Sequence, residues 1–393
     1  MQLPARFQTL PAYAFPRLRE LLDPHPGGGE PIHMTIGNPR HASPPWVMDV
    51  VAEHAASFAN YPQNDGTDGL RAAIAGWIDR RYGATVDPAG QILPLNGTRE
   101  GLFNAAVAIC PERKNGTTPV ILTPNPFYQV YAVAALAMGA EPHYVPATEA
   151  TGFLPDYARL DREILDRTAI AYICSPSNPQ GAVADAEYWR TLLNLAERHD
   201  FRIFADECYS EIYRDRAPTG ALEIAQEIGA DPERVVIFNS LSKRSNLAGL
   251  RSGFAAGGPK TLAAMKQLRN YAGAPLPTPL QAVSERAWSE EAHVEASRAR
   301  YATKYDIADS ILGEVPGAAS PQAGFFLWLP VEDGEAAALR LWRETGVRVL
   351  PGAYLSRDVN GANPGRGYVR VAMVAEEDEM ARGLTAIRDC LYA

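Results

Sequence analysis

VVIFNSLSKRSNLAGLRSGF, residues 235–254, is the stretch of sequence that decides the fold of this chain. It opens with an unbroken apolar run, VVIFNS (235–240), and continues into a turn rich in hydroxyl groups and cations. An unbroken apolar run is typical of a strand covered on both faces, as in a parallel sheet flanked by helices. The sequence therefore predicts a buried parallel strand at 235–240 with a polar turn at its carboxyl end.

Similar apolar runs alternate with amphipathic segments from about residue 61 to about residue 258. The further runs are PVILTP (119–124), AIAYICSP (169–176) and FRIFADE (201–207). The helix-like segments between them include 70–82, 99–110 and 186–199. Strands that alternate with helices favour an α/β fold, with a mostly parallel sheet covered by helices on both faces.

The pattern changes after about residue 282. A long helical stretch precedes short strands that are punctuated by Gly and Pro: FFLWLP, VRVLPG and YVRVAMV. This change indicates a second, smaller α/β domain, which the N-terminal segment joins. We predict a large domain over 46–282 and a small domain formed by 1–45 and 283–393.

Composition excludes several classes of protein. The chain has 393 residues and a net charge of −9, which argues against sequence-independent binding to nucleic acid or to an anionic membrane. No apolar run approaches the ~20 residues of a membrane span, and the N-terminus lacks a signal peptide, so we expect a cytoplasmic protein. The cysteines form no CxxC or Cys/His cluster, so we expect small buried residues and no metal site. They are Cys110, Cys174, Cys208 and Cys390.

In open α/β sheets, ligands bind at the carboxyl ends of the strands. Lys243 follows the run 235–240, between Ser240 and Arg251. Hydroxyls and an arginine suit a phosphate dianion, and nearby cations lower the pKa of a lysine amine, as Schiff-base formation requires. A lone lysine would more often be a solvated surface group, so its neighbours carry the argument.

Other polar residues follow the neighbouring strands. Asp206 could keep a heterocyclic nitrogen protonated, or it could cap a helix. Asn178 could donate to a phenolate oxygen, or it could belong to a tight loop. Gly97 and Thr98 open a helix, where an anion could bind or the helix could simply be capped. Tyr128 is a core residue by default, yet it could cover a planar ring.

Taken together and in this order, the segments resemble fold-type I pyridoxal-phosphate enzymes, the class I/II aminotransferases. The resemblance runs through IGNP (36–39), Tyr61 with GLR (69–71), NGTREGLF (96–103), PNPFYQVY (124–131), SPSNPQGA (175–182), ADECYSEIY (205–213), SLSKRSNLAGLRSGF (240–254) and YVRVAMV (368–374). It covers nearly the whole chain. The resemblance implies pyridoxal 5′-phosphate as cofactor and a large domain with a seven-stranded, mostly parallel sheet.

The resemblance also implies roles around the cofactor ring. Lys243 would hold pyridoxal phosphate as a Schiff base and move the proton of the reaction. Asp206 would pair with the pyridinium nitrogen. Asn178 and Tyr209 would bind the 3′ oxygen, and Tyr128 would stack on the ring.

Phosphate and substrate contacts follow from the same resemblance. The phosphate would be held by Gly97, Thr98, Ser240 and Arg251. Tyr61 would reach the phosphate from the other subunit, which makes a homodimer the expected active form. Arg370 would bind the substrate α-carboxylate, with Gly37 lining the same pocket. For a second anionic end of the substrate, Arg99 is the first candidate, and Arg40 and Arg244 are alternates that could equally be structural.

Several segments are similar to the narrower group of N-succinyldiaminopimelate aminotransferases, especially NPGRGYVRVAMVA. This implies transfer of an amino group from N-succinyl-L,L-2,6-diaminopimelate to 2-oxoglutarate, forming glutamate. Asn38 and Gln180 depart from that pattern and leave the acceptor open. The alternatives are an aspartate, aromatic or acetylornithine aminotransferase, a lyase with the same cofactor, or a regulator with a retired domain.

Overall fold

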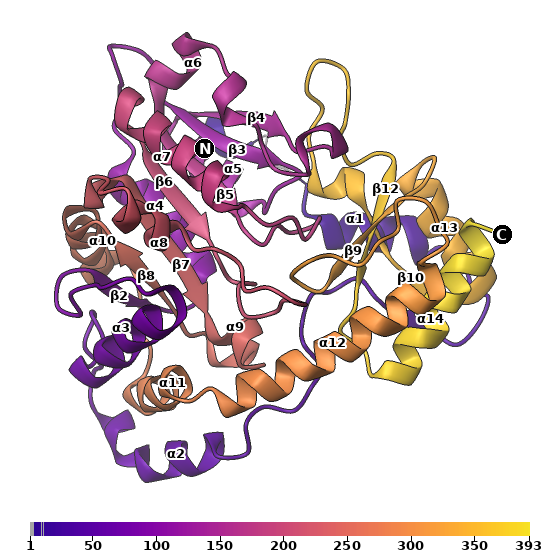
Figure 1. Ribbon diagram of the computed structural model, residues 1–393, viewed down its shortest axis with the longest axis horizontal. Helices are drawn as coiled ribbons and strands as arrows, with labels where there is room; N and C mark the ends of the chain where they lie inside the picture. Colours follow the sequence, from indigo (N-terminus) through magenta and orange to yellow (C-terminus); the bar gives the residue numbers. More distant parts are fainter. Residues whose placement is uncertain (1–3, 9, 11) are drawn as a thin grey trace.

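A seven-stranded sheet forms the centre of the larger part of the protein (Figure 1). The computed structural model describes residues 4–8, 10 and 12–393. The spatial order of the strands is β2-β8-β7-β6-β5-β3-β4, and β8 runs in the direction opposite to the other six strands of this sheet. The strands are β2 (Ile92–Leu95), β3 (Val120–Asn125), β4 (Glu141–Pro146), β5 (Thr168–Cys174), β6 (Arg202–Asp206), β7 (Val235–Ser240) and β8 (Gly253–Gly257). The predicted mostly parallel α/β sheet is confirmed.

Helices cover both faces of this sheet because alternate strand residues point to opposite sides. In β5, Ala171 and Ile173 pack into one apolar core, whereas Ile170 and Tyr172 pack into the other. The first core is covered by α3 (Asp68–Tyr82), α7 (Ala186–His199), α8 (Ala221–Glu227) and α11 (Thr278–Ser289). The second is covered by α4 (Thr98–Ile109), α5 (Val130–Ala137) and α10 (Pro259–Ala272).

Three strands of the sheet, β2, β4 and β8, do not appear among the predicted apolar runs, and β8 and β4 lack the pattern of a buried strand. β8 reads GFAAG and lies between β7 and β2. A Cβ atom at Gly253 would come within 2.7 Å of the carbonyl oxygen of Asn239, so a small residue is required there. β4 reads EPHYVP and lies at the sheet edge, partly exposed. Neither strand carries the bulky apolar pattern by which buried strands are recognised.

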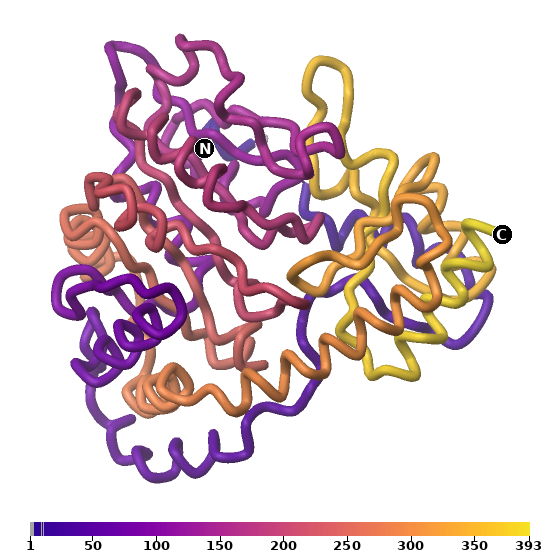
Figure 2. Tube along the Cα trace, in the orientation of Figure 1, coloured from indigo at the N-terminus to yellow at the C-terminus, as the bar shows by residue number. Residues whose placement is uncertain are grey.

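The smaller part of the protein joins the two ends of the chain. β9 (Phe326–Pro330), β11 (Leu350–Pro351) and β12 (Tyr368–Ala372) form an antiparallel sheet, and β1 (Ile32–His33) pairs with β10 (Val347–Arg348). The helices here are α1 (Ala14–Leu22), α13 (Gly334–Thr345) and α14 (Glu377–Leu391). Figure 2 shows the N-terminal segment, in indigo, running beside the yellow C-terminal part. The predicted strands of the smaller part are confirmed.

The boundaries between the two domains remain a proposal, and one of them needs correction. The predicted boundary at 282/283 falls inside α11, where Val283, Ala287 and Trp288 belong to the core of the large sheet. We therefore propose that the small domain resumes with α12 (Ala292–Leu312), the long helix that leads away from α11 in Figure 1.

Three shorter helices complete the α-helices of the described residues, which also include short 3-10 helices. They are α2 (Val47–Glu53), α6 (Arg162–Arg167) and α9 (Leu241–Arg244). In the part of the chain that the structure describes, no helix is both long and apolar enough to cross a membrane.

Candidate active site

A cavity of about 260 Å³ lies where the carboxyl ends of the strands face the small domain. It brings together most of the residues singled out in the sequence, although they span more than 300 positions of the chain. Those lining the cavity are Gly37, Thr98, Arg99, Tyr128, Asn178, Asp206, Tyr209, Ser240, Lys243, Arg251 and Arg370. The shared wall follows from topology, because parallel strands end at the same edge of a sheet.

The amine of Lys243 lies in the cavity, one turn after the end of β7. Ser240 begins α9 and accepts a hydrogen bond from the backbone N–H of Ser242 at 3.1 Å. Lys243 Nζ donates to the carbonyl oxygen of Gly37 at 2.5 Å. Burial lowers the pKa of Lys243 to about 8, and the positive charges of Arg370 and Arg251 act in the same direction. A nucleophilic free amine is therefore accessible near neutral pH.

A buried carboxylate, Asp206, lies at the end of β6. Its Oδ2 accepts a hydrogen bond from the phenol of Tyr131 at 2.7 Å, and its Oδ1 accepts one from the backbone N–H of Cys208 at 3.3 Å. Burial raises the pKa of Asp206, while the bond from Tyr131 opposes that rise. The Tyr131 ring stacks on Tyr172 at 4.5 Å. Sequence analysis missed Tyr131, although it follows Tyr128 by one helical turn.

Arg370 is a buried arginine with spare hydrogen-bonding capacity. Its Nη1 donates to Asn178 Oδ1 and its Nη2 to the carbonyl oxygen of Thr35, both at 2.8 Å. Its Nε is buried and has no partner, and no carboxylate pairs with it among the described residues. Burial lowers the pKa of Arg370 to about 10. A buried cation without an anion is costly, so this position suits the carboxylate of a ligand.

Asn178 links Arg370 to the phenol of Tyr209. Its amide donates to the Tyr209 hydroxyl at 3.5 Å while its oxygen accepts from Arg370. The Tyr209 ring packs edge-on against Phe325 and Phe326. Together they place a phenol and an amide beside Arg370 in the cavity that Lys243 also lines, where an oxygen of a bound ring would find donors.

At the start of α4, a second group of donors surrounds Gly97. This glycine has φ of +83°, and a Cβ atom there would lie 2.2 Å from Nη2 of Arg251. Thr98 Oγ1 lies 3.2 Å from the sulfur of Cys208. Arg251 forms no ion pair within the described part of the chain. The N-terminus of α4, the hydroxyls of Thr98 and Ser240 and the Arg251 guanidinium are donors that could hold an anion.

Arg99 is the cation at the outer wall of the cavity. Its Nε donates to the hydroxyl of Tyr128 at 2.7 Å, and this bond raises the pKa of Arg99. Tyr13, from the N-terminal segment, lines the same wall and was missed in the sequence. Cys174 and Cys208 also line the cavity, which their scattered positions did not indicate.

The two alternates to Arg99 are wrong as ligands of a distal carboxylate. Arg40 lies outside the cavity and pairs with Glu379 at 3.0 Å. Arg244 is the last residue of α9 and is buried; it donates to the carbonyl oxygen of Ala287 at 2.6 Å and pairs with Glu291 at 2.7 Å. Both guanidinium groups are occupied by protein partners, so neither is available to a substrate.

Tyr61 does not enter the cavity of its own chain. Its side chain is fully exposed, with a relative accessibility of 103%. The predicted contact across a dimer interface therefore stays a prediction.

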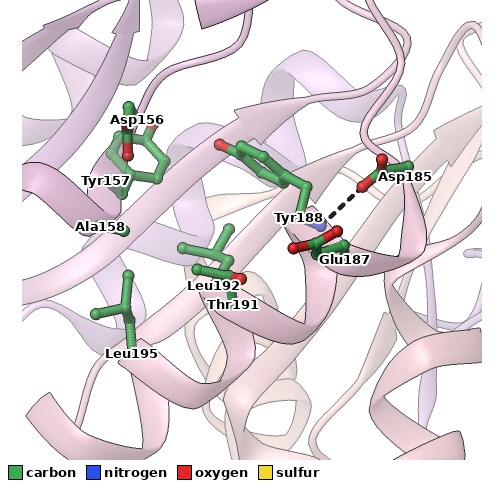
Figure 3. A pocket seen from close by; sticks show the side chains of 9 residues that line it. All are labelled: Asp156, Tyr157, Ala158, Asp185, Glu187, Tyr188, Thr191, Leu192 and Leu195. Atoms are coloured by element: carbon green, nitrogen blue, oxygen red, sulfur yellow. Dashed lines mark hydrogen bonds between the residues drawn. The ribbon is translucent and has the colours of Figure 1, made fainter.

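A second hollow lies beside α7, and its lining residues do not form a comparable set of reactive and anion-binding groups (Figure 3). Asp185 caps the helix by accepting from the N–H of Tyr188 at 2.8 Å, and the Tyr188 hydroxyl donates to the carbonyl oxygen of Pro155. These polar groups already have protein partners.

The cavity fits the cofactor that the sequence resemblance implies. Its buried acid, Asp206, can pair with a ring nitrogen, and its amine, Lys243, can react with an aldehyde. Its anion site around Gly97 and Arg251 can hold a phosphate. Pyridoxal phosphate carries these three groups around one ring, so the donor set matches its chemistry.

Comparison with known proteins agrees with this geometry. The profile of the family described as aminotransferase class I and II matches residues 30–387. An aminotransferase structure from Neisseria meningitidis has a TM-score of 0.94 at 37% identity, covering 98% of this chain and 99% of that one. An LL-diaminopimelate aminotransferase of Moorella thermoacetica is 30% identical over 100% of this chain and 99% of its own.

A further solved structure bears a more specific name. The probable N-succinyldiaminopimelate aminotransferase from Thermus thermophilus has a TM-score of 0.83 at 26% identity, covering 96% of this chain and 100% of that one. The family match covers most of the chain, and enzymes of this family depend on pyridoxal phosphate. The chain therefore belongs to the aminotransferase class I and II family and is a pyridoxal-phosphate-dependent aminotransferase.

Proposed function

We propose that this aminotransferase passes the amino group of N-succinyl-L,L-2,6-diaminopimelate to 2-oxoglutarate, which becomes glutamate. The observation that carries the proposal is a pair of cations in one cavity: Arg370, buried without a carboxylate, and Arg99 at the outer wall. Both substrates carry at least one carboxylate besides the α-carboxylate at the reacting carbon. The names of the Thermus and Moorella relatives support substrates of the diaminopimelate group.

We assign the roles around the ring as the sequence resemblance implies. When bound, the cofactor supplies an electron sink for the carbanion at the substrate Cα. Lys243 moves the proton at that carbon, and Asp206 keeps the ring nitrogen protonated. Asn178 and Tyr209 bind the 3′ oxygen, while Tyr128 covers the ring face.

The phosphate and the substrate use the remaining residues of the site. Gly97, Thr98, Ser240 and Arg251 hold the phosphate. Arg370 binds the substrate α-carboxylate beside Gly37.

We also propose a cytoplasmic homodimer in which Tyr61 completes the partner's phosphate site. Phe58, Tyr61 and Tyr271 are large side chains left exposed on this chain. Exposed aromatic groups of this kind are typical of an interface between subunits.

A half-reaction screen tests the proposed substrate. The holoenzyme is mixed with one amino donor at a time, and loss of the absorbance of the covalently held cofactor is followed. We expect a fast response to glutamate and to N-succinyl-L,L-2,6-diaminopimelate. A response to unsuccinylated L,L-diaminopimelate, but not to the succinyl compound, would favour the activity named for the Moorella relative. A response to aspartate, an aromatic amino acid or acetylornithine alone would refute the proposal.

Arg99→Ala is expected to weaken the binding of dicarboxylic substrates selectively. Loss of one charge-assisted contact at a partly exposed site should lower kcat/KM for glutamate by roughly tenfold. A monocarboxylic amino acid serves as an internal control, because it has no distal anion for Arg99 to bind. Steady-state kinetics with both donors measure the difference, and an equal loss for the two would assign Arg99 a structural role.

Cofactor capture by the apoenzyme should depend on pH in one direction. Because burial lowers the pKa of Lys243 to about 8, the amine is mostly protonated below that pH and mostly free above it. The capture rate should therefore rise by about tenfold per pH unit below pH 8 and level off above it. Stopped-flow absorbance at saturating pyridoxal phosphate measures this profile, and a flat profile between pH 6 and pH 8 would contradict it.

A further inference from the structure

The loop that carries Tyr61 is fixed by hydrogen bonds, although Tyr61 itself projects into solvent. Arg71 Nη1 donates to the carbonyl oxygens of Asp65 and Gly66 at 3.0 and 2.6 Å. Lys266, on α10, pairs with the Asp65 carboxylate at 2.5 Å. An exposed aromatic side chain on a fixed loop is well suited to contact a second chain.

Arg269 is a buried arginine that connects this loop to two other segments. Its side chain is only 2% exposed. Nη1 donates to the carbonyl oxygens of Asn64 and Pro94, both at 3.0 Å, and Nε donates to Glu100 Oε1 at 2.8 Å. Asn64 belongs to the loop of Tyr61, Pro94 to the end of β2, and Glu100 to the first turn of α4. One guanidinium thus holds the Tyr61 loop and both sides of the turn between β2 and α4, at points 169 to 205 residues before it in the chain.

Glu100 extends the connection to the turn at 96–98. Its Oε2 accepts a hydrogen bond from the backbone N–H of Asn96 at 3.3 Å, and its Oε1 also accepts one from the Asn104 amide at 2.9 Å. The residues directly after Asn96 form the anion site against Arg251. The position of that turn therefore depends on where Glu100 is held.

The ion pair between Arg269 and Glu100 does more than occupy a buried position. Two apolar side chains could occupy a buried site at lower desolvation cost. The ion pair instead directs hydrogen bonds at the main chain of two loops, at Asn64 on one side and Asn96 on the other. Main-chain contacts of this kind fix where a loop lies, independently of its side chains.

We propose that Arg269 is a positioning residue for two active sites at once. Through Glu100 it holds the 96–98 turn, which binds the cofactor phosphate in its own subunit. Through Asn64 it holds the loop whose Tyr61 completes the phosphate site of the partner subunit. The inference rests on the proposed homodimer and on the proposed role of Tyr61.

Mixed dimers, in which the two subunits carry different substitutions, separate the effect of Arg269 on the 96–98 turn of its own subunit from its effect on the Tyr61 loop. One subunit carries Lys243→Ala, so that only the other subunit holds the cofactor covalently. Pyridoxal phosphate is titrated into the apo dimer, and absorbance of the covalently held cofactor gives the dissociation constant of the intact site. Arg269→Gln is placed in either subunit. We expect the dissociation constant to rise by roughly tenfold in both placements.

Two further variants control the experiment. Glu100→Gln interrupts only the connection from Arg269 to the 96–98 turn of the same subunit. It should therefore weaken cofactor binding when placed in the subunit with the intact site, and not when placed in the Lys243→Ala subunit. Arg234→Gln is the matched control, because Arg234 pairs with Glu197 and Asp200 near the amino ends of β6 and β7 and does not line the cavity. It should change the dissociation constant by less than about twofold.

The outcomes are distinguishable. The proposal would be overturned if Arg269→Gln, placed in the Lys243→Ala subunit, left the dissociation constant of the intact site unchanged. It would also be overturned if Arg234→Gln raised that dissociation constant as much as Arg269→Gln does. If Arg269→Gln dimers do not assemble, Glu100→Gln decides, since equal effects from both placements would also overturn it. A wild-type chain that is monomeric or binds no pyridoxal phosphate would instead refute the proposed function, and sedimentation and titration of the wild type establish this first.

Discussion

Lys243→Ala is expected to lower kcat by about 10⁴-fold or more, because it removes both the amine that holds the cofactor and the proposed proton carrier. Lys243 is the lysine that lines the cavity in the described part of the chain, and burial lowers its pKa to about 8. Steady-state kinetics with N-succinyl-L,L-2,6-diaminopimelate and 2-oxoglutarate measure the loss. Mass spectrometry after borohydride reduction should show covalent cofactor on the wild type and none on the variant.

Lys304→Met is the matched control for this prediction. Lys304 is also a buried lysine, and burial lowers its pKa to about 8, but it lies on α12 and does not line the cavity. We expect Lys304→Met to retain covalent cofactor and a kcat within about threefold of wild type. If Lys243→Ala kept its activity, or if Lys304→Met lost the cofactor, Lys243 would not be the attachment site.

Arg370→Ala is expected to weaken the binding of every α-amino acid substrate. Removing one partner of a buried charge pair costs about 3 kcal/mol, which corresponds to a roughly 150-fold lower kcat/KM. The Arg370 guanidinium is held by Asn178 and Thr35 and has no carboxylate of its own, so the ligand must supply that anion. The loss should appear mainly in KM, and steady-state kinetics with two chemically different amino acids should show it for both.

Arg40→Ala is the control for Arg370→Ala. Arg40 is close in sequence to Gly37, yet its guanidinium pairs with Glu379 outside the cavity. Surface ion pairs of this kind contribute about 0–1 kcal/mol, so kcat/KM should stay within roughly fivefold of wild type. A loss confined to one donor in Arg370→Ala would argue against an α-carboxylate site, because every substrate carries that group.

Local pattern was sufficient for most of the large sheet. The run 235–240 became β7 with the predicted bounds, and the runs at 119–124, 169–176 and 201–207 each overlap a strand. Buried parallel strands are recognisable because both of their faces must be apolar. β8 was not recognisable, since its small residues are required by close neighbours that lie elsewhere in the sequence.

Some residues of the candidate site could likewise be predicted from the local sequence, and others could not. Asp206 ends a strand and Asn178 and Lys243 each follow one, so their shared cavity could be inferred from the order of strands and polar residues alone. Tyr131 was missed because its bond to Asp206 joins positions that are 75 residues apart. Arg40 and Arg244 were wrong alternates because their ion-pair partners, Glu379 and Glu291, lie far along the chain.

By itself, the sequence determined the α/β sheet, the family and the lysine after β7, since these depend on local apolar pattern and on residues at strand ends. Only the tertiary structure decided which arginines are free. Arg370 lacks a carboxylate and Arg99 faces the cavity, whereas Arg244 is occupied. The availability of a charge depends on burial and on partners brought close by folding, and no local pattern records those distances.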